Sequence, residues 1–277
     1  MLKDDDYKEP RCAFDFDFYK DKKERPELKG RIKVSEMLSR VDRLYAREDF
    51  ERVEKALDEY INEARALGDC EGELSAVNEL VGCLRMSGKA EKGEKTVERC
   101  FELLALTGQD DTTSGGTVLL NAATALCAFG KPEKALETYK EACRIYSRHL
   151  PPSDERFAGL YNNMASAYES TGDFTEAEKY YKAAIKVLDS YNTANCVLDK
   201  AVTYLNLAML YNAEGFDDGR MEKSAEEAMK ILDSDIEREF YYAHTARKCA
   251  GGFSYLGYFL FASELNERAD KYYNERS

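Results

Sequence analysis

Three asparagines recur at almost constant spacing in the middle of the sequence. Asn121, Asn163 and Asn206 are 42 and 43 residues apart. An asparagine amide carries donor and acceptor groups, so a row of them can pair with the N–H and C=O groups of an extended peptide, whatever its side chains. Asparagine is also mildly unfavourable inside a helix unless something else selects it. These residues are therefore candidates for main-chain recognition, with bonds inside their own structural unit or exposure to water as the alternatives.

Few other residues have the types and spacing that catalysis needs. The two histidines, His149 and His244, are far apart in the sequence and have no metal-ligand spacing around them, which argues against a zinc site or a histidine-based triad. Residues 114–117, Ser-Gly-Gly-Thr, lack the spacing of a phosphate-binding loop and are better explained as the start of a helix. We therefore expect no enzymatic activity, no catalytic residues, no metal site and no cofactor.

The composition fits an acidic protein built from amphipathic helices. Of 277 residues, 44% are hydrophobic and 34% are charged, with only 5 prolines. The net charge of −13 at pH 7 disfavours a nucleic-acid partner, and no basic stripe offsets it. The 8 cysteines occur without a CxxC pair, as packing residues of a reduced intracellular protein would. No signal peptide or membrane-spanning segment of ~18 apolar residues is evident, so we predict a cytoplasmic protein without a membrane partner.

The asparagines belong to a pattern that recurs along most of the chain. One helix is predicted around Tyr161, Ala165 and Tyr168, which share a face at helical spacing, and Gly172 ends it. A second helix follows the turn and starts its own row of small and aromatic residues at Ala177. The two segments together predict one helix hairpin.

The same frame occurs about six times. Its first large residues stand at 37, 77, 119, 161, 204 and 253, so successive copies are 40, 42, 42, 43 and 49 residues apart. Small residues let the two helices of a copy approach closely, while Tyr, Phe and Leu fill the space between copies. A single hairpin cannot bury its apolar face alone, so we expect the copies to stack.

This pattern resembles the tetratricopeptide repeat family, and its long spacing resembles the versions found in kinesin light chain and in Pins-type polarity adaptors. The resemblance covers residues 34–277 and implies an all-α fold, a right-handed α-α superhelix of about six helix hairpins. It also implies a concave groove lined by the first helix of each hairpin. Tryptophan, common at the leading position in the family, is absent.

Residues 1–33 lie outside the repeat, so two regions are predicted, 1–33 and 34–277. The first is charged and aromatic, and we predict a tail or a cap on the first repeat. A position in the groove is the alternative, because Phe and Asp alternate near residues 14–19 as they would in an extended segment.

The resemblance also implies which residues would contact a ligand. In the long-repeat adaptors the matching asparagines hold the backbone of a bound peptide, a role implied here for Asn121, Asn163 and Asn206. Further positions predicted to face the groove are Asn162, Ser166, Met209, Tyr255 and Tyr258. The two tyrosines belong to an aromatic cluster in the last repeat, for which a place in the core is the alternative.

The sequence therefore predicts a scaffold or adaptor that holds an extended segment of a protein or peptide partner in its groove. Two other functions remain open. One is a receptor for a small signalling peptide that lacks a DNA-binding domain, and the other is a structural protein that assembles with itself. The oligomeric state is not determined by these patterns.

Overall fold

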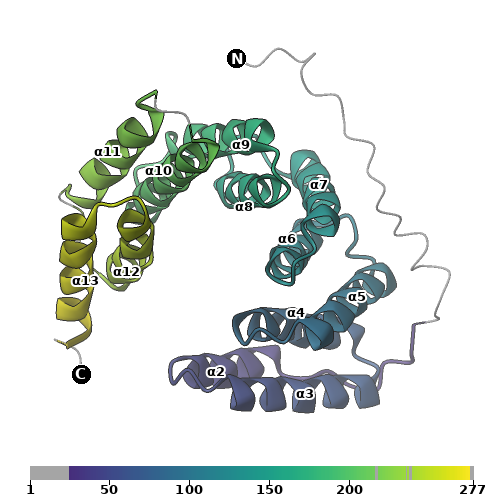
Figure 1. Cartoon of the computed structure of the whole chain (residues 1–277). Coiled ribbons are helices and arrows are strands. Elements are labelled where there is room, and N and C mark those ends of the chain that lie inside the picture. The colour runs from purple at the N-terminus through teal and green to yellow at the C-terminus, as the bar shows by residue number, and fades with distance from the viewer. Residues whose placement is uncertain (1–24, 216–217, 235, 237–238, 275–277) are drawn as a thin grey trace. The chain divides into compact units, whose positions relative to one another are not determined.

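The protein consists of α-helices joined by turns. The structure, a computed structural model, describes residues 25–215, 218–234, 236 and 239–274, and these contain helices and no strands. Consecutive helices contact one another as hairpins (Figure 1). The pairs are α2 (Val34–Tyr45) with α3 (Phe50–Leu67), α4 (Cys70–Met86) with α5 (Ala90–Thr107), α6 (Thr113–Ala128) with α7 (Pro132–His149), α8 (Arg156–Ser170) with α9 (Phe174–Leu188), α10 (Ala194–Glu214) with α11 (Arg220–Leu232), and α12 (Phe240–Tyr255) with α13 (Phe259–Asn274). The predicted all-α repeat of about six hairpins is confirmed.

The hairpin of α8 and α9 shows why this sequence folds in this way. Ala165 and Ala177 belong to one buried cluster, where their small side chains permit close helix packing. Gly172 ends α8 with a φ of 81°, a left-handed conformation that glycine adopts without steric cost. The Asp173 side chain then accepts the N–H of Glu176 at 3.1 Å and caps α9.

The chain divides into two compact units after Leu150. The first contains α2 to α7, in which α4 packs on α3, and α6 packs on both α4 and α5. The second contains α8 to α13, in which α10 packs on α9, and α12 packs on α10. Neighbouring hairpins within a unit therefore bury each other's apolar faces, as the repeat pattern requires.

The cysteines of the described part act as small apolar side chains. Six are buried, and Cys127 is partly exposed. Burial raises the pKa of the Cys127 thiol to about 11. A thiol with so high a pKa carries almost no thiolate at neutral pH, so packing explains these residues better than reactivity does.

The described residues before α2 pack across the turn between α3 and α4. The N–H of Lys29 donates to the Leu67 carbonyl at 2.8 Å, and the N–H of Ile32 donates to Asp69 Oδ2 at 3.0 Å. Gly68 permits this approach, since a Cβ there would stand 2.1 Å from the Glu27 carbonyl oxygen. Residues 1–24, including the alternating aromatic segment, lie outside the described residues, and the assignment of 1–33 to a tail or cap stays a prediction.

The helices carry many polar side chains along their length. None of those in the described part of the chain combines the length and apolar character needed to cross a lipid bilayer.

Candidate functional site

The first helices of the second unit carry a stripe of polar residues along one face. In α10, Asp199 and Asn206 lie two helical turns apart on one face, with the apolar Val202 between them. Together with residues of α8 and α12 they line a cavity of about 470 Å³. The polar residues that α8 and α12 contribute include Asn162, Asn163, Ser166, Tyr241, Thr245 and Lys248.

The charges in this cavity nearly balance. Burial raises the pKa of Asp199, while a hydrogen bond from the Tyr241 hydroxyl and the charge of Lys248 oppose that shift. Burial and the neighbouring Asp199 likewise raise the pKa of Tyr241. His244 is exposed at the cavity, where its ring stacks on Phe240 with the centroids 6.2 Å apart. A lining of this kind suits dipolar groups such as peptide amides better than a strongly charged ligand.

Two further cavities adjoin the first and share residues with it. One, of about 310 Å³, is mostly apolar and is lined by Val202, Met209 and Tyr255 among others. The other, of about 390 Å³, includes Met209 and Ser166. Asn206 borders all three cavities, so they form one continuous surface along α8, α10 and α12.

The structure brings most of the predicted contact residues to this surface. Six of them line one or more of the three cavities: Asn162, Asn163, Asn206, Ser166, Met209 and Tyr255. Tyr258 does not line them, because it lies in the turn after α12 and its ring makes an edge contact with Phe253, the centroids being 6.1 Å apart. The contacts of Tyr258 therefore fit packing against the core better than a position in the groove.

Asn121 lies in the first unit, in α6, apart from the surface described above. Its Nδ2 donates to Oδ1 of Asn78 in α4 at 3.1 Å. This bond links neighbouring hairpins rather than two helices of the same hairpin. The described surface thus contains two of the three recurring asparagines.

Asn162 has an unusual hydrogen-bonding arrangement. Its Nδ2 donates to Thr203 Oγ1 at 2.7 Å, and that hydroxyl donates to the Asp199 carbonyl at 2.8 Å. Its Oδ1 is buried and has no hydrogen-bond partner among the described residues. Because one polar atom is already bonded to α10 and the other is enclosed, Asn162 positions α8 against α10 and is a weaker candidate for ligand contact than Asn206.

Several residues of the surface were not indicated by the repeat pattern. Asp199 and Lys248 occupy the same position of the frame, five residues before the leading residues Tyr204 and Phe253, but the residue type there differs from copy to copy. Asp199 does, however, precede Asn206 by 7 residues, and Lys248 precedes Tyr255 by 7, which is two helical turns along the same face. A search two helical turns before each predicted contact residue would have identified both.

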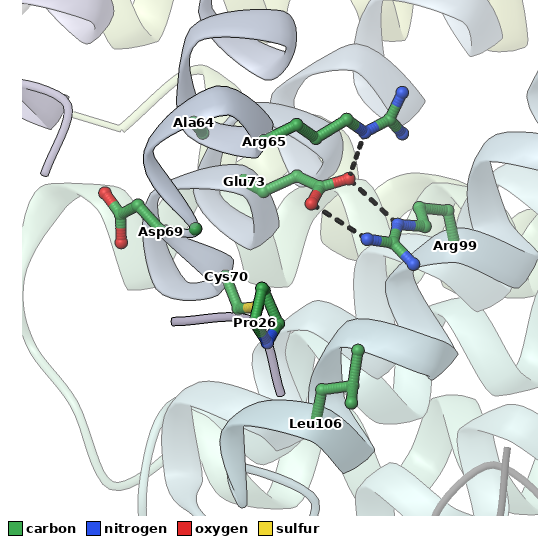
Figure 2. Close-up of a pocket in the computed structure, with 9 residues that line it drawn as sticks. Pro26, Ala64, Arg65, Asp69, Cys70, Glu73, Arg99 and Leu106 are labelled. Carbon is green, nitrogen blue, oxygen red and sulfur yellow. Dashed lines mark hydrogen bonds and ion pairs between the residues drawn. The ribbon is translucent and has the colours of Figure 1, made fainter. Parts of the chain in front are cut away.

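A separate cavity of about 250 Å³ lies in the first unit (Figure 2). There the buried carboxylate of Glu73 accepts hydrogen bonds from Arg65 Nε at 2.7 Å and from Arg99 Nε and Nη2 at 2.8 Å each. Pro26 and Leu106 complete part of the wall. Because these side chains pair with one another, the network is best explained as a structural link between helices α3, α4 and α5. Within the described ranges, no group of three or more His, Cys, Asp or Glu side chains could hold a metal ion.

Comparison with known proteins agrees with this architecture. A tetratricopeptide repeat model matches residues 73–148, which span α4 to α7, and a second matches residues 158–187 in α8 and α9. The chain is a tetratricopeptide repeat protein. Its repeats resemble those of kinesin light chain: it is 27% identical over 194 residues to Protein KINESIN LIGHT CHAIN-RELATED 3 of Arabidopsis thaliana. That match takes in 68% of this chain, which spans only 29% of the length of that curated relative.

Solved structures show the same fold at lower identity. BtubC (BKLC) from P. vanneervenii aligns with a TM-score of 0.57 at 20% identity, over 82% of this tetratricopeptide repeat protein and 92% of that chain. NprR in complex with its cognate peptide NprX aligns with a TM-score of 0.55 at 15% identity, over 85% of this chain and 66% of that one.

Proposed function

We propose that this tetratricopeptide repeat protein is a non-enzymatic protein-binding scaffold that holds an extended segment of a partner on the α8–α10–α12 surface. The observation that carries the proposal is the position of Asn206. It borders all three cavities, and its amide makes no hydrogen bond to another described residue. A polar amide at the centre of a continuous concave surface is free to pair with a ligand.

The chemistry of the surface suits the main chain of an extended peptide. Asn206 offers a donor and an acceptor, and Asn163 and Thr245 line the same cavity. A peptide main chain presents alternating N–H and C=O groups, which such side chains can pair with irrespective of sequence. Asp199, Glu169 and Lys248 bring charges of both signs to the surface, so neither sign of net charge is required of the ligand.

Two further points support a polypeptide ligand. The curated relative is named as a protein related to kinesin light chain, and the fold neighbour NprR is described in complex with its cognate peptide. We extend the proposal to Asn121, whose exposed amide in the first unit would serve a second stretch of the partner. Binding of a short signalling peptide by the same surface would use the same contacts and is the second candidate.

Affinity capture from a lysate of the source organism would test the proposal. The intact chain is compared with the double variant Asn163→Ala/Asn206→Ala. Asn195→Ala is the matched control, because it removes an exposed asparagine of α10 that lines none of the three cavities. We expect the double variant to lose partner proteins that the chain and the control both retain.

Unchanged capture by a correctly folded double variant would contradict the assignment to this surface. Circular dichroism and thermal unfolding establish that all three proteins are folded. Elution of a short peptide instead of a protein would favour the signalling-peptide function over the scaffold.

A further inference from the structure

Two adjacent glycines lie within helix α12, at the apolar cavity beside Asn206. Glycine is unfavourable inside a helix relative to alanine, so each position calls for an explanation. Close packing explains the glycine at position 252, Gly252. A Cβ there would stand 2.8 Å from Leu205 Cδ2 and 3.3 Å from Met209 Sδ, so a side chain would displace both neighbours.

Gly251 has no such explanation within the fold. A Cβ at this position would meet no atom within 4 Å, and the residue is exposed. Gly251 nevertheless lines the apolar cavity. A side chain there would therefore project into the cavity and fill space that is now open.

Gly159 repeats this arrangement on the opposite side of the surface. It lies in α8, lines the polar cavity, and a Cβ there would also meet no atom within 4 Å. Two helices that face the same surface thus each carry a glycine that packing does not require. What the two positions share is the open space in front of them.

The cavity in front of Gly251 has an apolar wall and a polar edge. Val202, Leu205 and Met209 form the side contributed by α10, and Tyr255, which is 66% exposed, stands at the end of α12. Asn206 borders this cavity and the polar one alike. A peptide group bonded to Asn206 would therefore have an adjacent side chain positioned to enter the apolar cavity.

We propose that the cavity in front of Gly251 is a subsite for one large aliphatic side chain of the bound polypeptide, and that Gly251 determines specificity by keeping it open. The inference rests on the proposed function, because it assumes that the main chain of the ligand pairs with Asn206. An aliphatic side chain fits because the wall is made of Val, Leu and Met side chains, whose contacts with it would be dispersive and would exclude water.

A displayed library of random linear peptides, selected on the full-length chain, provides the probe. Parallel selections use Gly251→Leu, which fills the cavity, and Ser254→Leu, which adds the same bulk at an exposed position of α12 outside the three cavities. We expect peptides selected on the chain to be enriched in Leu, Ile or Met at one position. The affinity of those peptides for Gly251→Leu should be lower by ~10-fold or more, the usual scale for losing one apolar subsite contact. Their affinity for Ser254→Leu should equal that for the unaltered chain.

The outcomes separate this inference from the proposed function. Selected peptides that lose binding to Asn163→Ala/Asn206→Ala but show no aliphatic position, or bind Gly251→Leu unchanged, would overturn the subsite and leave the proposed function standing. Failure of the chain to select any peptide would overturn both. Because a leucine at Gly251 meets no neighbouring atom at its Cβ and improves helix propensity, loss of folding is not expected, and thermal unfolding checks it.

Discussion

Asp199 is a carboxyl group held where ionisation is unfavourable. Burial is the largest influence on it and raises its pKa above the ordinary value, so the native state binds this proton more readily than the unfolded chain does. The free energy of unfolding should therefore fall as the pH rises from about 4, the unfolded pKa, through the higher native pKa. Asp199→Asn removes the ionisation, and we expect it to be more stable than the chain at pH 7 and no different near pH 3.5. Urea unfolding at both pH values measures this.

A second variant checks the direction of that effect. The Tyr241 hydroxyl donates to the Asp199 carboxylate and lowers its pKa, so it opposes the effect of burial. Tyr241→Phe should raise the pKa of Asp199 further and make the loss of stability between pH 4 and pH 7 steeper. A smaller pH dependence in Tyr241→Phe would contradict this account of Asp199.

Gly251 also permits a prediction about stability. Since a Cβ at this position meets no atom within 4 Å, Gly251→Ala should stabilise α12 by about 0.5–1 kcal/mol, the ordinary difference between glycine and alanine in a helix. Gly252→Ala should instead destabilise the protein, because its Cβ would lie 2.8 Å from Leu205 Cδ2. Urea unfolding of the two variants measures both effects. Destabilisation by Gly251→Ala would mean that packing, not an open subsite, explains this glycine.

At the scale of the elements, Asp69 joins the start of α4 to the segment before α2. Its Oδ1 accepts the N–H of Gly72 at 3.1 Å as a helix cap, and its Oδ2 accepts the N–H of Ile32 at 3.0 Å. Asp173 caps α9 through the N–H of Glu176, also at 3.1 Å, without a second bond of this kind. The two aspartates thus make the same cap bond, but only Asp69 is buried, and only Asp69 also bonds Ile32 and lies in an ion pair, its Oδ1 3.7 Å from Arg31 Nη1.

Asp69→Ala should therefore cost more than Asp173→Ala. Loss of the cap accounts for about 1 kcal/mol in each variant. Asp69→Ala also leaves the N–H of the buried Ile32 without its acceptor, which adds about 1–3 kcal/mol. Urea unfolding compares the two variants, and amide exchange of Ile32 should accelerate only in Asp69→Ala. Equal costs would mean that the segment before α2 contributes little to stability.

The sequence was enough to predict the helix hairpins, because their packing is set by residues close together in the chain. The alternation of Ala with Tyr or Leu in each pair of helices requires one face to be buried, whatever lies next to it. It was not enough to predict the hydrogen bonds of the asparagines. The partners of Asn121 and Asn162 are Asn78 and Thr203, which are 43 and 41 residues away in neighbouring hairpins. Their pairing depends on how hairpins stack, which the pattern within one hairpin does not specify.

At the scale of the whole molecule, the charge of the chain differs from that of the proposed surface. The chain carries −13, whereas the three cavities of the surface have two carboxyl groups, Asp199 and Glu169, and one lysine, Lys248, in their lining. A partner that approaches meets a negative field, which affects the rate of association and its dependence on salt. Under the proposed function, selection among partners would depend on hydrogen bonds to Asn206 and on the apolar cavity more than on net charge.

The stacking of hairpins also determines how far a local defect spreads. Glu73→Ala removes the buried carboxylate that Arg65 and Arg99 share, and Arg99 keeps its pair with Glu102, so we expect a cost of about 1–3 kcal/mol. In a repeat protein each hairpin is stabilised mainly by its immediate neighbours. We therefore expect amide hydrogen exchange to accelerate in α3, α4 and α5, while α10 to α13 keep the protection of the unaltered chain.

A matched control variant tests whether the effect on amide exchange is specific to the buried network. Glu91 makes an exposed pair with Lys95 in α5, so Glu91→Ala should change exchange little, in keeping with the ~0.3–0.5 kcal/mol of such pairs. Equal loss of protection in both units of Glu73→Ala would mean that the chain unfolds as one cooperative body. Loss confined to the first unit would instead mean that the surface on α8, α10 and α12 keeps its geometry when the first unit opens, because the residues that line it all come from the second unit.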